Sequence, residues 1–127
     1  LTAYVGPPGG YVLKFSNGLT VYLSGDTGVT AEQDIVVRRE FHANLVVMNI
    51  GGIYSTGPKE AAYVINELVK PNAVIPSHAN EVATQGGKIR AGAKTAIFAK
   101  SVHIPVHLPL SGRTMEFAGN ATCVKGC

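Results

Sequence analysis

The pattern of apolar and polar positions over the first third of the chain predicts a hairpin followed by a short helix. Residues 11–25, YVLKFSNGLTVYLSG, contain two β-rich runs on either side of Asn17-Gly18, a dipeptide typical of tight hairpin turns. The second run ends just before Asp26, which therefore follows the C-terminal end of a strand. Over residues 30–42 the apolar spacing is helical, and the segment opens with the Thr-x-x-Gln pattern of a capping box.

The middle of the chain predicts a parallel strand–helix–strand unit. An unbroken apolar run within residues 43–52 is bounded by glycines, which is typical of a strand buried on both faces. A helix is predicted over residues 57–71, with Pro58 in its first turn and Pro71 beyond its end. A further apolar run ends in His78. The short links between these segments favour parallel strands with a covering helix.

The last third is less regular. A loop leads into a helix predicted over residues 92–100, and residues 102–117 are interpreted as two strands that turn at residues 111–112. Because proline cannot donate to a strand ladder, Pro105 and Pro109 place the first of these strands at a sheet edge. No internal repeat, low-complexity segment or linker is present. These patterns predict a single α/β domain over residues 1–127.

Composition narrows the classes of partner. Of 127 residues, 46% are hydrophobic and 15% are charged, which is typical of a globular domain rather than a disordered segment. The formal charge of +3 comes from basic residues scattered along the chain, so no nucleic-acid partner is expected. No apolar stretch approaches the ~20 residues that a membrane span needs, and no leader opens the chain at Leu1, so no membrane partner is expected either.

The two cysteines lie close together at the C-terminal end. Cys123 and Cys127 could close a small disulfide loop in which Gly126 gives the backbone freedom, and the alternative is two free thiols. A disulfide favours a periplasmic or secreted location, and free thiols a cytoplasmic one. Metal binding by this pair alone is not expected, because four ligands are the norm and no further cysteine exists.

Two residues with metal-binding chemistry follow predicted strands. Asp26 in SGDTG and His78 in PSHANE are each delivered by a loop after an apolar run, and ligands of open α/β sheets bind at that edge. Carboxylate and imidazole are ligands for Zn, Mn or Fe. The alternatives are a turn aspartate and a histidine hydrogen-bonded under a loop, and two ligands are too few for a tight site.

Further polar residues surround these two. Tyr54, Ser55 and Thr56 lie where the helix of residues 57–71 begins, and free N–H groups there favour an anion, such as a substrate carboxylate or phosphate. The alternative is a plain helix cap by Thr56.

Residues beside the later motif, and the remaining histidines, receive separate interpretations. Asn80 and Glu81 are candidates for groups that orient the neighbouring imidazole. We interpret His103 and His107 as ordinary surface or edge residues, and His42 as a residue that faces solvent or the helix dipole.

Taken in order, SGDTG, NIGG, TGPKEAAYVI and VIPSHANE resemble the C-terminal half of metallo-β-lactamase-fold hydrolases, especially the branch that includes ascorbate-6-phosphate lactonase. The resemblance covers residues 10–81. It implies that Asp26 bridges two metal ions and that His78 ligates the second, with zinc as the metal and Mn or Fe as alternatives. It further implies a metal-activated water that attacks a lactone, a phosphodiester or another ester or amide.

The family signature His-x-His-x-Asp-His is absent from these 127 residues. The chain is therefore expected to form only half of an αββα sandwich, a mixed sheet with covering helices. Such a half would leave one sheet face open, and the expected partner is the N-terminal half of the same fold or a second copy of the chain. The small-molecule substrate would bind between the halves.

Two other functions compete with hydrolysis. The first is a non-catalytic α/β binding or assembly module that has lost its metal site. The second is a nucleotide-binding domain with GPPGG as a phosphate loop, which is weak because that stretch precedes a strand and lacks a Gly-Lys-Ser/Thr ending.

Overall fold

The computed structural model describes residues 9–127, so most of GPPGG lies outside the described residues. Helices η1 and η2 have π-type hydrogen bonding. Along the chain the elements are β1 (Tyr11–Lys14), β2 (Thr20–Leu23), η1 (Gln33–Glu40), β3 (Leu45–Asn49), α1 (Pro58–Tyr63), η2 (Val64–Val69), β4 (Ala73–Ser77), β5 (Thr84–Gln85), β6 (Lys88–Ile89), α2 (Lys94–Ser101), β7 (Glu116–Phe117) and β8 (Cys123–Lys125).

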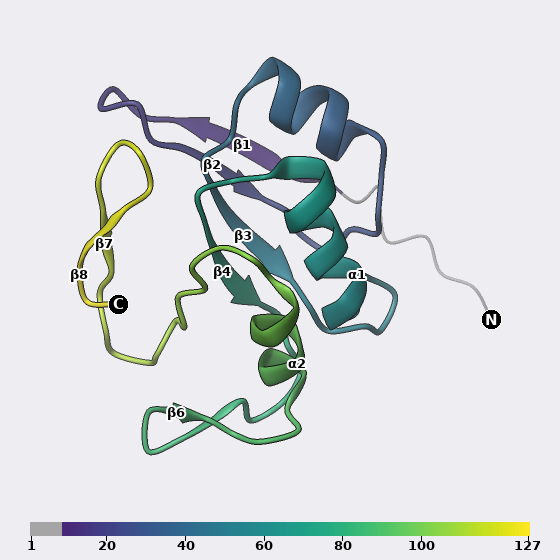
Figure 1. Cartoon of the computed structure of the whole chain (residues 1–127), viewed down its shortest axis with the longest axis vertical. Helices are drawn as coiled ribbons and strands as arrows, with labels where there is room; N and C mark the ends of the chain where they lie inside the picture. Colours follow the sequence, from purple (N-terminus) through teal and green to yellow (C-terminus); the bar gives the residue numbers. More distant parts are fainter. Residues whose placement is uncertain (1–8) are drawn as a thin grey trace.

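A mixed sheet of order β1-β2-β3-β4 forms the centre of the molecule (Figure 1). β1 and β2 form the predicted antiparallel hairpin, with Gly18 at φ 95° in its turn. β2, β3 and β4 are parallel, and Val21, Leu45 and Ala73 lie opposite one another across them. The expected mixed α/β architecture is confirmed, and the C-terminal ends of three parallel strands meet at one edge.

Helices cover one face of this sheet, where the main hydrophobic core lies (Figure 1). Val46 and Met48 from β3 are fully buried there against helical residues such as Ile65 and Phe98. Alternate residues of the same strands point to the opposite face, because strand side chains alternate. The continuous apolar runs are therefore buried on both sides, as their composition predicts.

The opposite face is more covered than expected. A second cluster there buries Val21, Leu45, Ala73 and Ile75 beneath the C-terminal segment that carries β7 and β8, and Ala121 packs into it. The expectation of a wholly open face is wrong, because the end of the chain folds back over the N-terminal ends of these strands. Apolar side chains stay exposed on the edge strand β1 and its turn, namely Tyr11, Leu13 and Phe15.

In the last third, the helix predicted over residues 92–100 is confirmed as α2, whereas one local prediction is wrong. Residues 102–117 do not form two paired strands. Val106 makes an isolated parallel bridge to Val74, and β7 pairs with β8 instead. The prolines at 105 and 109 remove two donors from that segment, which limits its pairing. The loop before α2 contains the short hairpin β5–β6, whose turn uses Gly86 and Gly87 at positive φ.

Cys123 and Cys127 are joined by a disulfide with a Cα–Cα distance of 6.4 Å, the first of the two alternatives that the sequence leaves open. Among the described residues, no helix has the length and apolar character needed to cross a bilayer.

Glu81 caps helix α2 from outside the helix. Its Oε2 accepts a hydrogen bond from the Lys94 N–H at 2.9 Å, and its Oε1 accepts from the Thr95 N–H at 3.0 Å and from the Thr95 hydroxyl at 3.2 Å. The N-cap residue Ala93 has no side-chain oxygen, so Glu81 satisfies the first amides in its place. Slight burial raises the pKa of Glu81, but these hydrogen bonds outweigh it and hold that pKa below its usual value.

The core position of Phe98 predicts a large stability loss on truncation. Phe98 lies on α2 and is fully buried against the sheet. Phe98→Ala should lower the free energy of unfolding by about 3–5 kcal/mol, measured by urea denaturation, because it leaves a cavity. The matched control is its neighbour Ile97, which is 37% exposed. An Ile97→Ala loss equal to that of Phe98→Ala would contradict the packing described.

The capping role of Glu81 predicts a specific pH dependence. Because the folded state lowers the pKa of Glu81, its contribution to stability is complete above the ordinary value of 4.5 and is lost as the pH falls through the folded value. The difference in unfolding free energy between wild type and Glu81→Gln should therefore shrink from pH 7 to pH 3. The exposed Glu67 provides a control, since Glu67→Gln removes one carboxylate from η2 and leaves the Glu81 cap of α2 in place. A constant Glu81→Gln difference over this range would refute the linkage.

Candidate metal site

Asp26 and His78 meet at the C-terminal edge of the parallel strands. Asp26 follows β2 and His78 follows β4, with β3 between them. The His78 Nδ1 lies 2.5 Å from the Asp26 Oδ1. Both side chains are open to solvent, His78 being 47% exposed and Asp26 68%. The fold thus brings the two predicted metal ligands together from distant parts of the chain, at an accessible edge.

A buried polar network fixes the loop that carries Asp26. The Ser24 hydroxyl and the Asn49 Oδ1 are 3.0 Å apart, and the Asn49 N–H donates to the same hydroxyl at 3.0 Å. The Asn49 side-chain amide donates to the Thr27 carbonyl at 3.2 Å, and the Thr56 N–H donates to that carbonyl at 3.0 Å. The Thr56 hydroxyl donates to the Asn49 carbonyl at 2.8 Å. Residues on both sides of Asp26 are therefore held by the end of β3.

Gln33 anchors the other end of this loop. Its side chain is buried, and its Oε1 accepts from the Thr30 N–H at 2.9 Å, which is one half of the predicted capping box. Its amide nitrogen donates to the Gly28 carbonyl at 3.2 Å and to the Tyr22 hydroxyl at 3.4 Å. Burial raises the pKa of Tyr22, and the hydrogen bond from Gln33 only partly opposes it, so the phenol is neutral at pH 7.

The backbone around His78 is held in an unusual conformation. His78 has φ 48° and Asn80 has φ 55°, in the left-handed region that non-glycine residues seldom adopt. The Lys94 ammonium donates to the Gly51 carbonyl at 2.8 Å and to the Ala79 carbonyl at 3.3 Å. Lys94 thus ties the loops after β3 and β4 to α2. Strain of this kind at a loop with a candidate ligand is typical of functional sites.

Gly51 permits the close approach of these two loops. A Cβ at residue 51 would lie 2.5 Å from the His78 carbonyl oxygen and 2.8 Å from the Asn80 side-chain nitrogen. Any side chain there must displace the loop that carries His78. The glycine is therefore a steric requirement of the site.

The other residues named from the sequence differ in burial and in the contacts they make. Tyr54 is fully exposed and Ser55 is half-buried, whereas Thr56 is buried with its hydroxyl engaged at Asn49. The carboxylate of Glu81 bonds α2 rather than the His78 ring. His42 and His103 are exposed and His107 is half-buried, while Asn80 packs beside Gly51.

Sequence reasoning missed Lys94 and Gln33 as supports of the site. Gln33 was placed correctly at a helix start, but the capping pattern does not reveal that it reaches back to Gly28 and Tyr22. No sequence pattern marks Lys94 as a support of the His78 loop. It is one of eleven basic residues and lies far along the chain from its acceptor at Gly51.

A cavity of about 250 Å³ opens directly beside His78. It lies between the end of β4, the start of α2 and residues 108–111. Apart from His78, no ionisable side chain among the described residues lines it, and its walls are Pro76, Ser77, Ala79, Ala83, Thr84, Thr95, Leu108, Pro109, Leu110 and Ser111.

The donor set fits a transition metal in part. The carboxylate oxygen and the imidazole nitrogen are at hydrogen-bonding distance, and a separation to about 3.3 Å would let both reach one tetrahedral cation with bonds of about 2 Å. A zinc site takes four ligands, of which these two residues supply two. Asp26 has a second oxygen with which to reach another cation, whereas a neutral imidazole nitrogen offers one lone pair.

The close contact at residue 51 predicts that an added methyl group disturbs the His78 loop when it is placed at Gly51 but not when it is placed at Gly28. Gly51→Ala should displace the His78 loop and cost about 1–3 kcal/mol of stability, as overpacking does. The expected results are a changed NMR signal of the His78 ring and a lower melting temperature. Gly28→Ala is the matched control, because a Cβ there meets no atom within 4 Å. An unchanged His78 signal in Gly51→Ala would contradict the geometry.

Both the sequence and the structure are similar to those of known proteins. No family model matches the chain. It is 31% identical over 112 residues to a UPF0173 metal-dependent hydrolase of Polynucleobacter asymbioticus, covering 88% of this chain and 38% of the relative. It is 40% identical over 74 residues to a UPF0173 metal-dependent hydrolase of Chloroflexus aurantiacus, covering 58% of this chain and 30% of that protein. The chain thus spans well under half the length of these curated relatives.

Two solved structures share the fold. Igni18, a metallo hydrolase from Ignicoccus hospitalis, aligns with a TM-score of 0.56 and 26% identity over 74% of this chain and 39% of its own. A putative Zn-dependent hydrolase of the metallo-β-lactamase superfamily from Thermotoga maritima aligns with a TM-score of 0.53 and 19% identity over 82% of this chain and 70% of its own. The homologues of this chain are UPF0173 metal-dependent hydrolases, and its fold is that of metallo-β-lactamase-type hydrolases.

Proposed function

We propose that this chain is part of a metal-dependent hydrolase and that it supplies Asp26 and His78 as metal ligands. The observation that carries the proposal is the 2.5 Å approach of these two side chains from the ends of β2 and β4. The homology to metal-dependent hydrolases supports the same chemistry. The metal in this proposal is zinc, with two ions per complete site and with Mn or Fe as alternatives.

Each residue of the site has a distinct task in this proposal. When bound, the metal supplies an acidified water and a positive charge that stabilises the oxyanion of the reaction. Asp26 and His78 hold the cation, and the Asn49 network keeps the Asp26 carboxylate at the strand edge. Lys94 and Gly51 keep the His78 loop in its left-handed conformation. These supports preserve the ligand geometry, which is what a metal site demands of its surroundings.

The cavity beside His78 favours an uncharged carbonyl substrate. Its lining is largely apolar and, over the described residues, includes no lysine or arginine, so it offers no counter-charge to a phosphodiester. A lactone or carboxylic ester with an apolar portion is therefore the proposed substrate class. Tyr54 and Ser55, which are accessible in the loop after β3, are the proposed contacts for its polar end. The kinship with ascorbate-6-phosphate lactonase stays a prediction, because the relatives' names state no substrate.

The remaining metal ligands are proposed to come from polypeptide outside these 127 residues. Two ligands from this chain and its small share of the relatives' length support this assignment. The chain would then be the C-terminal half of the domain, and its partner the N-terminal half, with a second copy as the alternative. The exposed apolar residues of β1 are available for that contact. An oxidising compartment is likewise a prediction that rests on the disulfide.

The experiment combines elemental analysis with hydrolysis assays on the protein together with any polypeptide that accompanies it on purification. We expect bound transition metal and hydrolysis of nitrophenyl acetate or simple lactones in preference to bis(nitrophenyl) phosphate. Asp26→Asn and His78→Gln should each lower kcat/KM by about 100-fold or more and reduce the metal content, because loss of even an outer-shell partner of a metal ligand costs about 10–100-fold.

His103→Gln is the matched control, because His103 is exposed and its backbone N–H donates to the Asn66 side chain on η2. Wild-type metal content in both Asp26→Asn and His78→Gln would overturn the ligand assignment. Preference for the phosphodiester would overturn the substrate class alone. Absence of metal and of activity from the purified protein would favour the binding or assembly module.

A further inference from the structure

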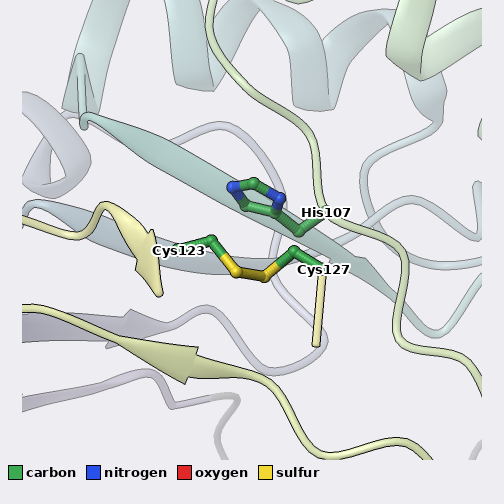
Figure 2. Close-up of side chains that lie close together, drawn as sticks. All are labelled: His107, Cys123 and Cys127. Atoms are coloured by element: carbon green, nitrogen blue, oxygen red, sulfur yellow. A yellow bond between two sulfur atoms is a disulfide. The ribbon is translucent and has the colours of Figure 1, made fainter. Parts of the chain in front are cut away.

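A second group of metal-binding side chains lies at the other end of β4. His107, Cys123 and Cys127 place one imidazole nitrogen and two sulfurs within 4.8 Å of one another. Figure 2 shows the His107 ring directly over the disulfide that joins the two cysteines. The sequence does not suggest such a group, because His107 lies well before Cys123 along the chain and its segment predicts only an ordinary edge residue.

The fold holds these residues in place. The His107 N–H donates to the Val74 carbonyl at 2.9 Å, which fixes the backbone of His107 along β4. Cys123 lies opposite Phe117 in the β7–β8 pair. The rings of His107 and Phe117 meet edge to face with centroids 5.4 Å apart. The imidazole and the hairpin that carries the cysteines are therefore packed against each other, independently of the disulfide.

This group is separate from the Asp26–His78 pair. It attaches to β4 at Val74, whereas His78 follows the end of that strand four residues later, a distance of about 13 Å along a strand.

The residue types suit a thiophilic cation once the sulfurs are free. Two thiolates and one imidazole are a common zinc ligand set, with Zn–S and Zn–N bonds of about 2.3 and 2.1 Å. Ligand atoms around a tetrahedral ion of that size lie within about 4 Å of one another. The imidazole nitrogen is already within 4.8 Å of both sulfurs, and the two sulfurs, which are bonded to each other here, would have to separate on reduction. Cys123 and Cys127 are separated by three residues, within the range of paired zinc cysteines, and Gly126 at φ 82° gives that loop freedom.

We propose that the Cys123–Cys127 disulfide is a redox gate over a zinc site formed by His107, Cys123 and Cys127. In the oxidised state the sulfurs are bonded to each other and provide no thiolate. A dithiol reductant gives two electrons and two protons to the disulfide and is itself oxidised to a disulfide, leaving two cysteine thiols. Binding of Zn²⁺ then releases both thiol protons, and water completes the fourth position. Cys123 and His107 are half-buried and Cys127 is exposed, so both reductant and ion have access.

The test uses Co²⁺ as a spectroscopic probe of thiolate coordination. The protein is reduced with dithiothreitol, freed of the reductant by anaerobic desalting, and titrated with Co²⁺ beside the oxidised protein. We expect a sulfur-to-cobalt charge-transfer band at one equivalent in the reduced protein, no band in the oxidised protein, and loss of the band on addition of Zn²⁺. Absence of the band from the reduced protein would overturn the proposal.

Variants assign the ligands. His107→Gln should weaken Co²⁺ binding at least about tenfold, and Cys127→Ser should abolish the charge-transfer band. His103→Gln, an exposed histidine on the same segment, should bind as wild type. The band should persist in the Asp26→Asn/His78→Gln double variant, which separates this site from the hydrolase site. Unchanged affinity in His107→Gln would show that the imidazole is no ligand and would overturn the three-residue site.

Circular dichroism of each reduced variant shows whether it is folded. The comparison of oxidised with reduced wild-type protein needs no substitution, so it tests the gate even where a variant fails to fold.

Discussion

The hydrogen bonds of Asn49 are the constraint on which the geometry of the site depends. This buried residue ends β3, and its backbone N–H, backbone carbonyl and both side-chain groups are all engaged. Its partners are Ser24, Thr27 and Thr56, which belong to the two loops that flank the central strand end. Leaving any of these buried groups unpaired costs about 1–3 kcal/mol, so the loops are held in one arrangement. The Asp26 carboxylate itself stays outside the network and faces solvent.

On the other side of β3, a close steric contact acts together with hydrogen bonds from α2. Gly51 allows the backbone of the His78 loop to come close, and the Lys94 ammonium joins both loops to α2. Glu81 then fixes the start of α2. The two candidate ligands are therefore positioned by different contacts, and Gly51 and Lys94 hold the loop in which His78 has its left-handed backbone.

The covering of the sheet explains why the candidate metal ligands Asp26 and His78 lie at one edge. Both faces of the parallel strands are covered, one by helices and the other by the C-terminal segment with β7 and β8. The strand ends are left as the open part of the sheet, and polar residues there meet water without disturbing either core. The same C-terminal segment that covers the second face also carries Cys123 and Cys127 to His107, so its packing serves stability and the proposed zinc site together.

Much of the local structure follows from the sequence alone. The Asn17-Gly18 turn, the apolar runs before Asp26 and His78, and the proline-started helix at Pro58 are set by short-range backbone preferences and by burial on both strand faces, which leave direct traces in residue order. Parallel strands place their C-terminal ends together, so the meeting of Asp26 and His78 was predictable in outline. Their 2.5 Å separation was not, because it depends on side chains that lie far apart in the sequence.

Only the tertiary structure shows which residues that are distant in the sequence hydrogen-bond or pack against one another. Glu81 lies next to the His78 motif in sequence, yet its hydrogen bonds go to α2, while Lys94 supports the His78 loop without any local signal. The fold-back of β7 and β8 over the second sheet face was equally hidden, because short irregular strands with prolines nearby carry little periodicity. Local propensity depends on neighbouring residues and can be read from the sequence, whereas long-range hydrogen bonds and close packing arise only when the whole chain has folded.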